Sequence, residues 1–101
     1  MDKRLLDAVA ACAPRDLPGF SGPDVSFREN RGAGGVTVRA EYFGTPPSGA
    51  DHDFDRLALE AYRRVGLLMR VHDTYCSEQL TSFRESGGYC LRWEATITPA
   101  A

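Results

Sequence analysis

His72, Asp73 and Cys76 form the one group in this sequence whose residue types suit nucleophilic catalysis, and they fall within five positions. A cysteine nucleophile needs a base within hydrogen-bond reach and a third group that orients that base. The other interpretation is that His72 is a polar or cationic cap at the end of a helix. A small enzyme or ligand-binding domain, with its site near His72–Cys76 and residues 14–23, is therefore kept as an alternative function.

Three alternating aspartates, Asp51, Asp53 and Asp55, resemble the start of a calcium-binding loop. Such a loop needs glycine at its sixth position and glutamate at its twelfth, where this chain has Arg56 and Tyr62. Acidic residues at the start of a helix instead satisfy orphan backbone N–H groups and suit the helix dipole. We predict no metal site here.

Gly32, Gly34 and Gly35 could cradle a phosphate only if they led into a helix N-terminus, where backbone N–H groups converge. They lie between two strand-like segments, so turn geometry explains them better. We predict no cofactor and no catalytic residue from these motifs.

The charged residues of two strand-like segments are the best candidates for binding a partner. Arg39 and Glu41, like Arg92 and Glu94, lie two positions apart and so share one face of their strand. These residues could form a structural cross-strand ladder of ion pairs, or they could belong to a surface that docks a partner. The predicted partner-binding residues are Arg28, Arg39, Glu41, Phe43, Arg84, Arg92 and Glu94.

Composition limits the classes of function. The chain has 101 residues and a net charge of −2, which argues against non-specific binding of nucleic acid or of an anionic membrane as its main role. Its length predicts a single domain over residues 1–101. An apolar stretch long enough to span a membrane is absent from the sequence.

The three cysteines, Cys12, Cys76 and Cys90, are an odd number without metal-type spacing. This pattern predicts reduced thiols and a cytoplasmic location, with a Cys76–Cys90 disulfide as the alternative.

A shift of 53 positions aligns residues 2–46 with residues 55–99 without a gap, and ten of the 45 pairs are identical. The identical pairs include Arg39/Arg92 and Glu41/Glu94. The repeated unit reads as helix–strand–strand. A second match, Ser-Phe-Arg-Glu at 26–29 and 82–85, has an offset of 56, so the facing of Leu80 relative to Phe83 stays open.

Hydrophobic periodicity places the elements that position these residues. The expected order is a helix over 2–13, a loop over 14–23, strands over 24–30 and 36–43, a helix from 51–54 to 72, and strands over 78–85 and 89–97. One face of the last strand carries Tyr89, Leu91, Trp93, Ala95 and Ile97. One stripe of the long helix carries Phe54, Leu57, Ala58, Ala61, Val65, Leu68 and His72, widened by Leu59, Met69 and Val71.

Two such units predict an α+β two-layer sandwich: a four-stranded antiparallel sheet in the order 1-2-4-3, with both helices on one face. This arrangement is a circular permutation of the ferredoxin-like one. A meander in the order 1-2-3-4 and a domain-swapped dimer are the competing arrangements.

The predicted function is a small cytoplasmic, non-enzymatic protein-interaction module, such as an adaptor, an immunity-type inhibitor or an accessory protein. Its partner, a different protein or a second copy of the chain, would dock on the open face of the sheet. Strand addition at the edge segments 24–30 or 78–85 is another route. Single-stranded nucleic-acid binding by the arginine-bearing sheet is a second alternative, in which bases would stack on exposed aromatics.

Overall fold

Two helices and four strands follow one another in the predicted order. The computed structural model describes residues 2–32, 34–44, 50–84 and 90–100. The elements are α1 (Lys3–Ala11), β1 (Phe20–Asn30), β2 (Gly35–Gly44), α2 (Ala50–Val71), β3 (Tyr75–Arg84) and β4 (Cys90–Pro99).

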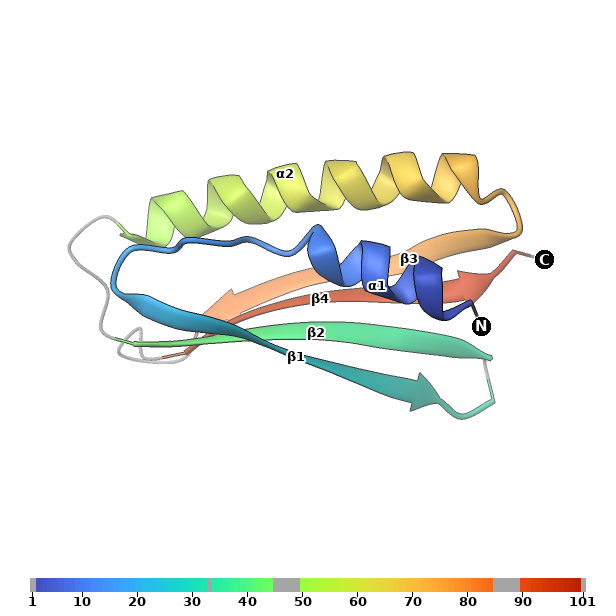
Figure 1. Ribbon diagram of the computed structural model, residues 1–101, viewed down its shortest axis with the longest axis horizontal. Helices are drawn as coiled ribbons and strands as arrows, with labels where there is room; N and C mark the ends of the chain where they lie inside the picture. The colour runs from blue at the N-terminus through green and yellow to red at the C-terminus, as the bar shows by residue number, and fades with distance from the viewer. Residues whose placement is uncertain (1, 33, 45–49, 85–89, 101) are drawn as a thin grey trace.

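The strands form one antiparallel sheet in the order β1-β2-β4-β3, which confirms the predicted order and excludes the meander. Figure 1 shows α2 running along the length of the sheet and the shorter α1 beside it, both on the same face. In the part of the chain that the structure describes, no helix lies on the opposite face of the sheet.

The central pair of strands sets which side chains enter the core. Ala40 of β2 lies opposite Trp93 of β4, and the pairing continues without a shift from Val36 opposite Ile97 to Phe43 opposite Cys90. Because side chains alternate along a strand, every second residue of both strands faces the helices. The buried residues of these strands in the core are Val38, Ala40, Tyr42, Leu91, Trp93, Ala95 and Ile97, as the alternation predicts.

Each helix buries one stripe against this apolar face. In α1 the carboxylate of Asp2 accepts a hydrogen bond from the backbone N–H of Arg4, which caps the helix, and Leu5 and Val9 are buried. The buried residues of α2 are Phe54, Ala58, Ala61, Val65 and Met69. The expectation that Leu59 and Val71 widen this stripe is wrong, because both lie on the flanks of α2 and are exposed.

Aromatic contacts join the helices to the central strands. The ring of Tyr62 stacks on Trp93 with their centroids 5.5 Å apart, and Tyr42 meets Phe54 edge to face. The hydroxyl of Tyr42 also donates a hydrogen bond to the carbonyl of Pro14, which ties the segment after α1 to the core.

Both edge strands begin earlier than the sequence suggested. The predicted loop over 14–23 is wrong at its end, because β1 starts at Phe20, and β3 starts at Tyr75 instead of 78. Each edge strand contains an irregularity of register, between Ser21 and Asp24 in β1 and between Ser77 and Gln79 in β3. A bulge accommodates Gly22 and Pro23 in an edge strand, where the N–H group that proline lacks is not needed for pairing.

The register of β3 also shows which faces of the sheet Leu80 and Phe83 occupy, a point on which the offsets of 53 and 56 disagreed. Leu80 lies opposite Ala95 on the helix side of the sheet, and Phe83 lies opposite Arg92 on the open side. Tyr89, which was predicted to face the core, lies outside the described residues. Among the described residues, no helix is long and apolar enough to cross a membrane.

Gly66 in α2 provides a test of the helix assignment. A methyl group added there would meet nothing within 4 Å, whereas glycine inside a helix costs about 1 kcal/mol relative to alanine. We expect Gly66→Ala to raise the free energy of unfolding by up to about 1 kcal/mol in urea denaturation. The contrasting variant is Gly35→Ala, whose added carbon would lie 2.8 Å from the carbonyl oxygen of Ile97 and should destabilise the protein. Destabilisation by Gly66→Ala would contradict the packing of α2.

Burial raises the pKa of the Tyr62 phenol to about 12, above the ordinary value of about 10. A raised folded-state pKa means that Tyr62 contributes its full stabilisation below about pH 10 and loses it as the pH rises towards 12. We expect the ultraviolet titration of the folded protein to contain a tyrosinate step near pH 12 that Tyr62→Phe removes. A Tyr62→Phe variant with an unchanged step at that pH would show that Tyr62 is not buried against Trp93.

Candidate functional site

The open face of the sheet is built from the residues that alternate with the core. On β2 these include Thr37, Arg39, Glu41 and Phe43, and on β4 they include Arg92, Glu94 and Thr96. Five of the seven predicted partner-binding residues lie on these two strands, and Arg28 joins them from β1, where it lies opposite Thr37. The seventh, Arg84, ends β3, and its side chain lies outside the described residues.

Two Arg–Glu pairs cross the centre of this face, which confirms the predicted ladder. Nη2 of Arg39 lies 3.2 Å from Oε2 of Glu94, to which Nε also donates a hydrogen bond. Nη2 of Arg92 lies 3.4 Å from Oε2 of Glu41. The side chains of all four residues are between 19% and 28% exposed, so they are held against the sheet and are not free to extend into solvent.

Arg92 makes a second contact, with Phe83 of β3. Its guanidinium carbon lies 4.2 Å from the centre of the Phe83 ring, a cation–π geometry. Its Nε is buried without a hydrogen-bond partner among the described residues. Phe43, near the same end of the face, is 47% exposed. This end of the open face therefore combines aromatic rings with an arginine held in place by Glu41.

The other end of the face is polar. The hydroxyl oxygens of Thr37 and Thr96 lie 3.0 Å apart, and Nδ2 of Asn30 donates a hydrogen bond to the Thr37 hydroxyl. A shallow hollow of about 150 Å³ lies here, lined by Arg28, Thr37, Arg39, Gln79, Thr81, Glu94 and Thr96. Arg28 is exposed, and the described residues show no ion pair for its guanidinium group.

Phe83 is the functional candidate that the sequence did not identify. The Ser-Phe-Arg-Glu match at an offset of 56 competed with the offset of 53 at this strand, and the two gave opposite facings. The signal that could have found it is the offset of 53, which aligns Leu80 with Phe27, because both of these residues lie on the helix side of the sheet and Phe83 therefore lies on the open side.

His72 and Cys76, which were considered as a nucleophile site, form hydrogen bonds with other residues. The backbone of His72 continues the hydrogen bonding of α2 to Leu68 and accepts a bond from Tyr75. Sγ of Cys76 lies 3.2 Å from the hydroxyl oxygen of Thr98. Within the described part of the chain, no hydrogen bond joins His72 to Cys76.

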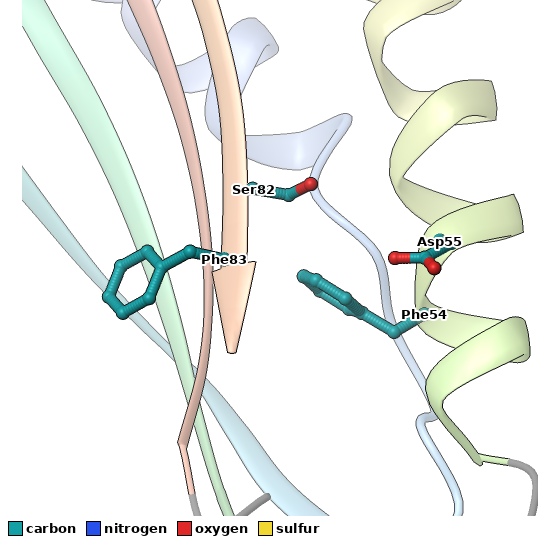
Figure 2. A pocket seen from close by; sticks show the side chains of 4 residues that line it. All are labelled: Phe54, Asp55, Ser82 and Phe83. Carbon is teal, nitrogen blue, oxygen red and sulfur yellow. The ribbon is translucent and has the colours of Figure 1, made fainter. Parts of the chain in front are cut away.

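A larger hollow of about 380 Å³ lies between α2 and β3, lined by Phe54, Asp55, Ser82 and Phe83. Figure 2 shows the Ser82 hydroxyl on the side facing α2, whereas the Phe83 ring lies on the opposite side of β3. A serine hydroxyl and a carboxylate border this hollow, and no histidine is among the residues that line it.

A third recess lies between the helices and is almost entirely apolar. It measures about 390 Å³ and is lined by Ala8, Ala11, Cys12, Arg64, Leu67, Leu68 and Val71. Burial raises the pKa of the Cys12 thiol, although the nearby Arg64 acts in the opposite direction, so the neutral thiol is favoured at this position. This recess was not predicted from the sequence, although Leu67 and Val71 are spaced by four residues and share a flank of α2.

Besides these hollows, the cysteines and the possible metal ligands were considered. Cys12 and Cys76 carry free thiols, so the alternative Cys76–Cys90 disulfide is not formed. In the described ranges, no three histidine, cysteine or acidic residues are grouped so that they could hold a metal ion. Comparisons with profiles of protein families, with curated proteins and with solved structures found no match to this chain.

The partly buried ladder should be energetically coupled. A double-mutant cycle of Arg39→Gln and Glu94→Gln should give a coupling free energy of about 0.5–1 kcal/mol that decreases at high salt. The exposed helix pair Arg56 and Glu60, at 3.4 Å, is the matched control and should give about 0.3–0.5 kcal/mol. Urea unfolding of the variants measures both cycles. No measurable coupling between Arg39 and Glu94 would contradict the described geometry of the open face.

Proposed function

We propose that this chain is a non-enzymatic interaction module that docks a protein partner on the open face of its sheet. The observation that carries this proposal is the grouping of Phe43, Phe83 and Arg92 on a sheet face that neither α1 nor α2 covers. Arginine and aromatic residues contribute most of the binding free energy in many protein interfaces. Arg92 is held in place by Glu41 and Phe83, so little side-chain entropy would be lost when a partner binds.

The electrostatics of this face favour a protein over a nucleic acid. Arg39 and Arg92 are each paired with a glutamate on the neighbouring strand, so their charges are already compensated. Phosphate binding depends on uncompensated cations that displace counterions. Tyr42 and Trp93 are buried under the helices and cannot stack on bases.

We also propose that the fold arose by duplication of a helix–strand–strand unit, as a permuted form of the ferredoxin-like arrangement. In support, the central register places Arg39 opposite Glu94 and Glu41 opposite Arg92. The offset of 53 residues exchanges these two pairs, as a two-fold axis through the Ala40–Trp93 pair would do. A cytoplasmic location is part of the proposal, and the free thiols of Cys12 and Cys76 support it.

Two exposed phenylalanines allow a matched test of the docking face. Phe43 is 47% exposed on the open face, and Phe27 is 48% exposed on the helix side of β1. The wild type, Phe43→Ser and Phe27→Ser would be used as baits in extracts of the source cell, and captured proteins identified by mass spectrometry. We expect a protein partner that binds the wild type and Phe27→Ser but is lost with Phe43→Ser.

Equal capture by all three baits would contradict docking on the open face. Capture of single-stranded nucleic acid that weakens steeply with salt, without a protein partner, would favour the nucleic-acid alternative instead.

A further inference from the structure

We propose that two copies of this chain pair through their β3 strands, antiparallel and around a two-fold axis at Leu80, to form one continuous eight-stranded sheet. This surface is the outer edge of β3 with the adjacent flank of α2, and it is separate from the open face that is proposed above to bind a protein partner.

The two edges of the sheet differ in how they are protected from such pairing. β1 carries Pro23 and three charged residues, Asp24, Arg28 and Glu29, all of which discourage addition of another strand. In β3 the charged residues are Glu78, at the irregularity of register, and the terminal Arg84, and the five residues between them, Gln79–Phe83, contain no charge, proline or glycine. An edge strand without such protection is a template for pairing with another chain.

Exposed leucines lie beside this unprotected edge. Leu80 is 37% exposed on the helix side of β3. In α2, Leu59 is 52% exposed. It lies four residues after Asp55, which lines the same hollow as Ser82 of β3, and three residues before Tyr62. Residues at these spacings share a helix flank, so Leu59 belongs to the flank above β3.

The two leucines also lie at the same level. α2 and β3 run in opposite directions (Figure 1). Two residues along β3 from Ser82 to Leu80 cover about 6.6 Å, and four residues along α2 from Asp55 to Leu59 cover about 6 Å. A two-fold axis at Leu80 would therefore gather Leu59 and Leu80 of both copies on the helix side of the joined sheet.

A second copy fits this edge because the segment is complementary to itself. With Leu80 opposite Leu80 of the second copy, Gln79 lies opposite Thr81 in the regular part of β3, so no charged residues face each other there. A two-fold interface requires this kind of self-complementarity. The contact is small for a stable interface, so the dimer should dissociate on dilution.

Sedimentation velocity from micromolar to millimolar concentration tests the proposal. We expect the wild type to shift from monomer to dimer over this range. Leu80→Lys would place two ammonium groups opposite each other and should raise the dissociation constant at least about tenfold. Phe27→Lys makes the matching change on β1, also at an exposed apolar residue on the helix side, and should dimerise like the wild type.

A cross-linking measurement covers the case in which Leu80→Lys fails to fold. In a Cys76→Ser background, Leu80→Cys should form a disulfide-linked dimer under mild oxidation, because directly opposite residues are close enough for that bond. Phe27→Cys in the same background should not. A wild type that stays monomeric throughout, or a dimer that Leu80→Lys leaves unchanged, would overturn the proposal. A dimer lost in Phe43→Ser and kept in Leu80→Lys would overturn it as well and would place self-association on the open face.

Discussion

The pairing of β2 with β4 is the constraint on which the rest of the structure depends. Opposite residues along the two strands run from Val36 and Ile97 to Phe43 and Cys90 in one register, with Ala40 against Trp93. Because side chains alternate with a period of two, a slip of one residue in either strand would reverse its two faces. Trp93, which is fully buried under Tyr62, would then face the open side, and the charged residues of β4 would enter the core.

This register also explains why the open face is neither a second core nor a random polar surface. Each arginine of the central strands forms an ion pair with a glutamate of the other strand, so the charges of this face are paired within the sheet. Phe83 then lies beside Arg92, and Phe43 stays exposed near them. The charges of the open face are therefore paired in the absence of a partner. Its arginine and aromatic side chains are of the types that contribute most to protein interfaces, as the proposed docking role requires.

Much of this arrangement could be predicted from residue patterns because the central strands alternate strictly. The inward set Leu91, Trp93, Ala95 and Ile97 and the two Arg–Glu pairs follow from period two and from the sequence match between residues 2–46 and 55–99. The strand order followed from pairing two helix–strand–strand units. The edges were harder to predict, since Gly22 and Pro23 are typical of loops and the bulge that keeps them in β1 depends on pairing with β2.

The flanks of α2 were the other part that local patterns did not determine. Leu59, Leu67 and Val71 are apolar, yet they lie on the flanks of α2 and are exposed, because the width of the buried stripe is set by where α1 and β3 lie. Phe83 was missed for a similar reason, since its facing depends on the irregularity between Ser77 and Gln79. The sequence of an element determines the periodicity of its apolar residues, but the neighbouring elements determine how many of those residues are buried.

The most direct test of this account is a nuclear Overhauser measurement of backbone proton contacts between β2 and β4. We expect cross-strand contacts that join Val38 with Ala95, Ala40 with Trp93, and Tyr42 with Leu91. A set of contacts displaced by one residue, such as Ala40 with Glu94, would contradict the assignment of both faces of the sheet.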